Sequence, residues 1–122
     1  MATSTGRMEV QIFGTRKNAA TRAALRFWAE RRVATHFVDL AERAASPGEL
    51  RRFAQRLGVT ALIDTSSRRY AELGLSQARY GDERWLALLA AEPLVVQQPL
   101  TRWQHRVTIG PAPDTWAAWV GK

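Results

Sequence analysis

The feature that most constrains the fold is a strand, a helix and a second strand that follow one another within the first forty residues. Residues 8–13 alternate, with Val10 and Ile12 on one face, which is typical of a strand. Residues 18–32 contain strong helix formers with an apolar stripe, and residues 36–40 predict a second strand. Because a helix joins them, the two strands should lie parallel with a right-handed crossover. The stripe consists of Ala20, Ala24, Phe27 and Trp28.

Two of the predicted helices begin with recognisable capping residues. Asn18 is a good N-cap for the first helix, because its side-chain oxygen can accept a backbone N–H of the first turn. In the second helix Ser46 is the cap, Pro47 takes the first helical position and Glu49 completes a capping box. This helix should run to about residue 57 and end at Gly58.

The middle of the chain predicts further helical structure, and two more strands follow it. We expect short helical or irregular segments at 59–63 and 69–73 and a later helix capped by Asp82. Strands are expected at 94–97 and 106–109, on either side of a turn.

A final helix ends the predicted order of elements. Pro113 and Asp114 open this helix, and Trp116, Trp119 and Val120 share one of its faces. The other tryptophans should pack in or near the core, whereas one in a polar turn should be the most exposed of the five. That residue is Trp103.

The order of elements is β-α-β, a helical insertion at about 46–92, and then β-β-α. It predicts an α/β protein with a thioredoxin-like fold, in which helices flank a mixed four-stranded sheet. We expect one domain over residues 8–122, preceded by a flexible N-terminus of residues 1–7. A length of 122 residues fits one domain of ordinary size.

The chain contains no cysteine, which removes several classes of chemistry. Disulfide scaffolds, Cys-ligated zinc or iron–sulfur sites and cysteine nucleophiles are all excluded. His36 and His105 have no further ligands at metal-binding spacing, so no metal site is expected. Neither a membrane-spanning run nor a secretory signal is present, and we therefore expect a cytoplasmic protein without a membrane partner.

The formal net charge is +7, and most of it lies near the first helix. Residues 7–32 hold seven basic and two acidic residues, so they carry +5 of that charge. Such a segment can attract an acidic protein, a small anion or nucleic acid. The alternative is a solvated arginine-rich helix face, which we favour over nucleic-acid binding because no nucleic-acid-binding motif accompanies the charge.

Several short motifs together resemble the arsenate reductase-like (ArsC/Spx) branch of the thioredoxin superfamily, which also includes YffB. The resemblance extends from about Met8 to Val120. It rests on the order and separation of the motifs rather than on any one of them. The motifs are QIFGTRK at 11–17, TRAA at 21–24, RR at 31–32, FVDL at 37–40, SPGEL at 46–50, YAELGL at 70–75, EPL at 92–94, QP at 98–99, and VTIG at 107–110 with Asp114 and Trp116.

The resemblance implies that the family's redox chemistry is absent from this chain. The family's catalytic cysteine falls at Asn18, and the second cysteine of a CxxC pair falls at Thr21. The arginines that hold the oxyanion in arsenate reductases fall at Gln98, Asp64 and Pro111, none of which is positively charged. A carboxylate at Asp64 would repel an arsenate ion.

A proline that is usually cis in thioredoxin folds is matched by Pro99, whose expected role is to turn the backbone between strands. Its functional alternative is to present backbone groups to an extended ligand. Asn18 has the same two interpretations, as a helix cap or as a ligand-binding group. Arg16, Lys17 and Arg22 flank the helix start and are candidates to hold a phosphate, sulfate or carboxylate there.

These observations favour a non-catalytic binding or regulatory protein over an enzyme. The Spx branch binds RNA polymerase, so an acidic protein such as the transcription machinery is one expected partner, and Gly58 falls near a glycine of that contact. The alternatives are a glutathione-dependent oxidoreductase that uses an external thiol, and a basic nucleic-acid-binding protein. No cofactor is expected. The candidate ligand-binding residues are Arg16, Lys17, Asn18, Thr21, Arg22, Gln98 and Pro99.

Overall fold

The computed structural model describes residues 8–121, so the prediction for residues 1–7 lies outside the described part. The strands are β1 (Glu9–Gly14), β2 (Ala34–Asp39), β3 (Leu100–Trp103) and β4 (Arg106–Ile109). The α-helices are α1 (Ala19–Glu30), α2 (Pro47–Leu57), α3 (Arg68–Glu72), α4 (Asp82–Ala91) and α5 (Pro113–Val120). Short 3-10 helices are η2 (Thr60–Leu62), η3 (Leu75–Gln77) and η4 (Pro93–Val95).

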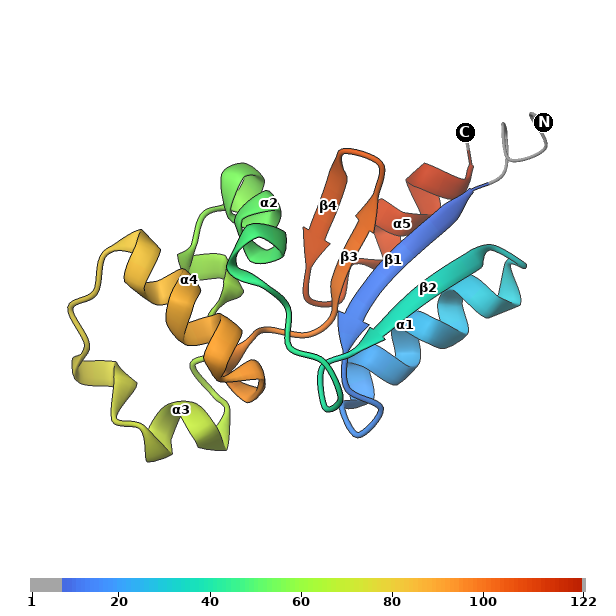
Figure 1. The fold of residues 1–122 in the computed structure, drawn as a ribbon. Coiled ribbons are helices and arrows are strands. Elements are labelled where there is room, and N and C mark those ends of the chain that lie inside the picture. The colour runs from blue at the N-terminus through green and yellow to red at the C-terminus, as the bar shows by residue number, and fades with distance from the viewer. Residues whose placement is uncertain (1–7, 122) are drawn as a thin grey trace.

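The four strands form one mixed sheet in the order β2-β1-β3-β4 (Figure 1). Strand β1 pairs parallel with β2 and antiparallel with β3, and β3 pairs antiparallel with β4. The expected parallel β-α-β unit and the expected mixed four-stranded sheet are therefore confirmed. The helices α2, α3 and α4 lie between β2 and β3 in the chain and form a helical segment beside the sheet (Figure 1).

Each face of the sheet carries its own hydrophobic core, because side chains of a strand alternate between faces. Val10 and Ile12 of β1 pack with Trp28 of α1 and with the tryptophans of α5. Phe13 points to the opposite face, where it meets Phe53 of α2 edge to face at 5.9 Å between ring centroids. Helices α1 and α5 thus cover one face, and the helical segment covers the other.

The caps predicted for the first two helices are present. The side-chain oxygen of Asn18 accepts the backbone N–H of Thr21 at 2.8 Å. The Ser46 hydroxyl accepts the N–H of Glu49 at 3.1 Å, and the Glu49 carboxylate accepts the N–H of Ser46 at 2.9 Å. Helix α2 ends at Gly58, whose φ of +89° is a conformation that favours glycine.

The predicted strand at 94–97 is wrong, and the third strand begins later, at Leu100. Residues Pro93–Val95 form the 3-10 helix η4, and Val96 makes a single bridge, to Ile63. A short apolar run indicates burial without specifying a strand, since Val95 and Val96 are both buried although neither belongs to a strand of the sheet. The strand at 106–109 and the short segments near 60–62 and 68–72 are confirmed.

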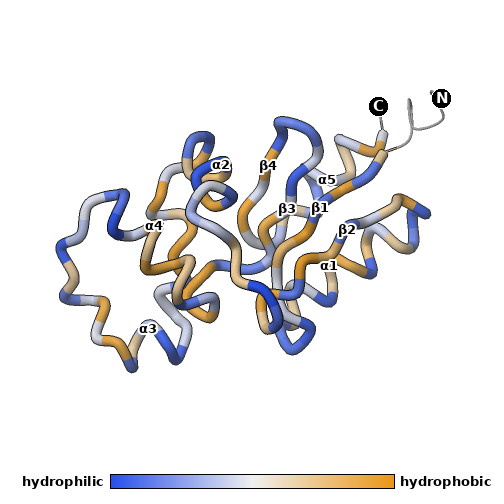
Figure 2. The backbone as a smooth tube through the Cα atoms, viewed as in Figure 1, coloured by the Kyte–Doolittle hydropathy of each residue, from blue (hydrophilic) through white to orange (hydrophobic). Residues whose placement is uncertain are grey.

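Two further details differ from the sequence prediction. Asp82 is the first residue of α4 rather than its cap, because Gly81 occupies the N-cap position. Its charge still favours the helix N-terminus. Trp103 is partly buried, since its ring packs 6.1 Å from that of Trp119 and the Arg106 guanidinium lies over it at 4.7 Å. The turn that follows Trp103 is hydrophilic (Figure 2).

Between residues 8 and 121, every helix is too short or too polar to cross a membrane.

Candidate functional site

The loop that joins β1 to α1 lies next to the chain segment that enters β3. Strand β1 ends at Gly14, and the first turn of α1 packs directly on this glycine. A Cβ atom at position 14 would collide with the Thr21 hydroxyl and would lie 2.7 Å from the Thr21 methyl carbon. The glycine therefore allows Thr21, which is fully buried, to reach the interior between β1 and β3.

The side-chain oxygen of Gln98 is the centre of a buried hydrogen-bond network. It accepts the backbone N–H of Thr15 at 2.7 Å and lies 3.1 Å from the Thr15 hydroxyl. It also lies 3.1 Å from the hydroxyl of Thr21. All three residues are at least 93% buried, since Gln98 and Thr15 are 7% exposed and Thr21 is 0% exposed. The network therefore ties the loop to the segment before β3.

Asn18 belongs to the same network through Thr21. Its side-chain oxygen lies 3.2 Å from the Thr21 hydroxyl, in addition to accepting the Thr21 backbone N–H. A hydroxyl carries one proton, so Thr21 shares that proton between Asn18 and Gln98. The amide of Asn18 is thus engaged in capping and cannot act as a nucleophile.

The peptide bond between Gln98 and Pro99 is cis. The carbonyl oxygen of Pro99 accepts the backbone N–H of Gly110 at 2.8 Å, which joins the start of β3 to the residue after β4. Pro99 is buried. Of the sequence-predicted site residues, the structure brings Asn18, Thr21, Gln98 and Pro99 together.

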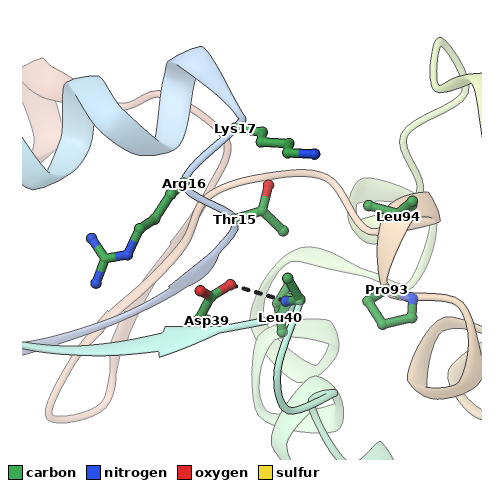
Figure 3. Close-up of a pocket in the computed structure, with 8 residues that line it drawn as sticks. Thr15, Arg16, Lys17, Asp39, Leu40, Pro93 and Leu94 are labelled. Carbon is green, nitrogen blue, oxygen red and sulfur yellow. Dashed lines mark hydrogen bonds between the residues drawn. The ribbon is translucent and has the colours of Figure 1, made fainter.

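The three basic residues at the helix start have separate surroundings. The Arg22 guanidinium donates to the carbonyl oxygen of Arg16 at 2.9 Å. The Arg16 guanidinium lies over the ring of Phe37 at 4.6 Å from its centroid. Lys17 extends toward Leu94, whereas Arg16 points away from it (Figure 3). Only the ammonium group of Lys17 is therefore directed across the neighbouring cavity.

A cavity of about 540 Å³ lies beside this loop (Figure 3). Its volume is within the range of small-ligand sites. One wall is apolar, and Leu94 within it is 57% exposed. Asp39 accepts the backbone N–H of Ala41 at 3.0 Å. The cavity is lined by Thr15, Arg16, Lys17, Asp39, Leu40, Ala41, Pro93 and Leu94.

Sequence reasoning missed the apolar half of this cavity. The sequence patterns place Leu40 and Leu94 in two expected strands, and Pro93 enters only through the EPL motif at 92–94. The cavity forms because the 3-10 helix η4 brings Pro93 and Leu94 beside the end of β2, and no local pattern predicts that contact.

The remaining positions of interest lie apart from the network. Asp64 makes a local turn, in which its carboxylate accepts the N–H of Ser66 at 3.0 Å and the Ser66 hydroxyl at 2.7 Å. Pro111 and Gly58 are exposed. Over residues 8–121 no group of three or more His, Asp or Glu side chains is arranged to hold a metal ion.

Comparison with known structures gives close matches to this fold. An arsenate reductase from Vibrio cholerae superposes with a TM-score of 0.81 at 24% identity, covering 93% of this chain and 98% of that one. The YFFB protein gives a TM-score of 0.83 at 21% identity, with 89% and 96% covered. An arsenate reductase (ArsC) related protein from Brucella melitensis gives 0.67 at 19% identity, with 93% and 96% covered. These likenesses establish the thioredoxin-like fold.

Comparison of the sequence gives two results. No curated protein matches the chain. The family profile described as ArsC matches residues 13–119, which is nearly the whole chain and includes the loop, the helical segment and the two last strands. The resemblance read from the motifs is confirmed, and the protein is a cysteine-free member of the ArsC family.

Proposed function

We propose that this protein is a non-catalytic binding protein, which docks an acidic segment of a partner protein at the cavity beside residues 15–17. The observation that carries the proposal is the role of Asn18. At the position where the family resemblance places the catalytic cysteine, an amide caps helix α1. Because the chain contains no cysteine, it has no thiolate to attack a substrate or form a mixed disulfide.

The surrounding polar groups also favour a binding role over catalysis. Gln98 and Thr21 are buried and bonded to each other, and Thr15 completes the network. A general base must reach the proton of a bound substrate, whereas these groups are satisfied within the protein. The network holds the loop in one conformation and so gives the neighbouring cavity a fixed wall.

The composition of the cavity favours an acidic segment with one apolar side chain. Leu40, Pro93 and the exposed Leu94 offer an apolar surface, on which burying a leucine-sized group stabilises a complex by about 1.5–3 kcal/mol. Lys17 extends over this surface, so an acidic residue next to the apolar group would find opposite charge there. By resemblance to the Spx branch, an acidic surface of the transcription machinery is the first partner to test.

The proposal is tested by titrating ¹⁵N-labelled protein with a short peptide of aspartates around a central leucine. We expect saturable chemical-shift changes at Thr15, Lys17, Ala41 and Leu94. Lys17→Glu and Leu94→Asp should each weaken binding by about tenfold or more. The matched control is Leu57→Asp, because Leu57 is a leucine of similar exposure, 47%, at the end of α2.

Two results would count against this function. Equal loss of binding in Leu57→Asp and Leu94→Asp would mean that the peptide has no defined site. Saturable binding of reduced glutathione, with shift changes centred on Asn18 and Gln98, would instead favour the oxidoreductase that uses an external thiol.

A further inference from the structure

A second cavity lies between helix α2 and the hairpin of β3 and β4, away from the loop 15–17. The hairpin stands next to α2 in the fold (Figure 1). The cavity measures about 310 Å³, and a smaller one of about 110 Å³ adjoins it through shared residues, Arg52 and Arg102. The larger cavity is lined by Arg52, Gln55, Arg56, Arg102, Gln104, His105 and Val107.

Three of these residues are arginines. Within residues 8–121, no carboxylate forms a salt bridge with Arg52, Arg56 or Arg102. The Arg102 guanidinium is held by two neutral acceptors. Its Nε donates to the side-chain oxygen of Gln11 at 3.3 Å, and its Nη1 donates to the carbonyl oxygen of Gln104 at 2.8 Å. This arrangement fixes the guanidinium in place and leaves its full positive charge on the cavity wall.

The nearest acidic side chain among the lining residues is already paired. Glu49 lines the smaller cavity, but its carboxylate binds Arg43 at 3.0 Å and accepts the N–H of Ser46. On α2, Arg52 and Arg56 are four residues apart, a spacing at which like charges on a helix repel each other. An anion between α2 and the hairpin would remove this repulsion.

The chemistry of the lining selects the kind of anion. Planar guanidinium groups bind phosphate oxygens through paired hydrogen bonds, and the amides of Gln55 and Gln104 add further polar groups. A volume of about 310 Å³ lies at the lower end of small-molecule sites. From these observations we propose that this basic cavity, defined by Arg52, Arg56 and Arg102, is a second binding site that takes a small molecule bearing a phosphate group.

This site is independent of the proposed docking cavity, because the two share no lining residue. The sequence alone did not indicate it, since the +5 segment lies in residues 7–32 whereas these arginines come from α2 and β3. Only the packing of the hairpin against α2 brings Arg102 beside Arg52.

The test uses pyrophosphate as the probe, at low ionic strength, with the ¹⁵N-labelled protein. We expect saturable shifts of the Arg102 Nε–H signal and of the backbone signals of Arg56 and His105. Arg102→Gln and Arg56→Gln should each weaken binding by about tenfold. Arg56 is exposed, so its substitution keeps the test valid if the Arg102 variant fails to fold.

The matched control is Arg26→Gln, because Arg26 is an exposed arginine on α1, which covers the opposite face of the sheet. It should bind pyrophosphate like the unaltered protein, and so should Leu94→Asp. Equal weakening by Arg26→Gln and Arg56→Gln would overturn the proposal, as would shifts that do not saturate. If succinate bound as tightly as pyrophosphate, the assignment of a phosphate group would be overturned. If a single-stranded oligonucleotide bound more tightly than pyrophosphate, the assignment of a small molecule would be overturned.

Discussion

The side-chain oxygen of Gln98 accepts the backbone N–H of Thr15 at 2.7 Å, and this bond joins two buried residues that are 83 positions apart. The bond links the loop after β1 to the segment before β3. Together with the hydroxyl of Thr21, it places the wall of the docking cavity relative to the sheet. The uncharged side chain of Gln98 therefore has a structural role, because it holds the loop after β1 against the segment before β3.

The first prediction concerns this bond. Gln98→Leu keeps the approximate size of the side chain and removes the acceptor, so the N–H of Thr15 is left buried without a partner. We expect the free energy of unfolding to fall by about 2–3 kcal/mol. Urea denaturation measures this change.

The control for that variant is Gln77→Leu, at an exposed glutamine in η3, which should change stability by less than about 0.5 kcal/mol. A loss of stability no larger for Gln98→Leu than for Gln77→Leu would show that the Thr15 N–H finds another partner.

A second prediction follows from the close approach of Gly14 to Thr21. Gly14→Ala places a methyl group against the Thr21 side chain, and overpacking of this kind costs about 1–3 kcal/mol. In the background of Thr21→Ala the colliding atoms are absent, so the same glycine substitution should cost less. A double-mutant cycle measured by thermal unfolding gives the coupling. Additive effects of the two substitutions would contradict the steric explanation.

Much of this fold was accessible from the sequence because local signals agreed with the final structure. Asn18 caps a helix whose apolar stripe does face the core through Ala24 and Trp28. The capping box of Ser46 and Glu49 is likewise formed by residues three positions apart. Local hydrogen bonds and periodicity determine such features, so one sequence is sufficient to predict them.

The features that were missed depend on contacts between distant segments. The apolar residues Val95 and Val96 satisfy the pattern of a strand, but Val95 ends the 3-10 helix η4 and Val96, although extended, makes only a single bridge, to Ile63. The docking cavity requires η4 to lie beside β2, and the basic cavity requires Arg102 to lie beside α2. Neither relationship leaves a periodic or local signal in the sequence.

The third prediction is a dependence of stability on pH. The hydrogen bond and charge of Arg43 hold the pKa of Glu49 below its ordinary value of 4.5. A lowered folded-state pKa means that the ionised carboxylate stabilises the fold at neutral pH. This contribution is lost as the pH falls below about 4.5 toward the folded-state pKa.

Glu49→Gln should therefore be less stable than the unaltered protein at pH 7, and the difference should shrink as the pH falls below about 4.5. Thermal unfolding across this range measures it. Arg43→Gln removes the largest cause of the shift, so Glu49→Gln should lose most of its pH dependence in that background. A difference that stays constant with pH would refute this assignment.

The fourth prediction compares two threonines that lie opposite each other on β3 and β4, Thr101 and Thr108. The Thr108 hydroxyl accepts the indole N–H of Trp116 at 2.8 Å, whereas in the described part of the chain the buried hydroxyl of Thr101 has no partner. Thr101→Val should raise the free energy of unfolding by about 1 kcal/mol, and Thr108→Val should lower it by about 1–3 kcal/mol. Urea denaturation of both variants measures these changes. A lower free energy of unfolding for Thr101→Val would contradict the prediction.

The last prediction tests whether the helix start still suits a thiolate. Asn18→Cys places a thiol at the N-cap of α1, whose first turn contains no acidic residue and is followed by the basic Arg22. Unpaired N–H groups and positive charge favour the thiolate, so the pKa of this thiol should lie below about 8.5, the ordinary value for cysteine. The pH dependence of alkylation by iodoacetamide measures it. Ala29→Cys, an exposed position at the other end of the same helix, is the matched control and should titrate at a higher pH. Equal titration midpoints would show that the start of α1 does not favour a thiolate.

The same Asn18→Cys variant has two further expected properties. Loss of the Asn18 cap should lower the free energy of unfolding by about 1 kcal/mol. We also expect no arsenate reduction, because Gln98 supplies no positive charge for an oxyanion.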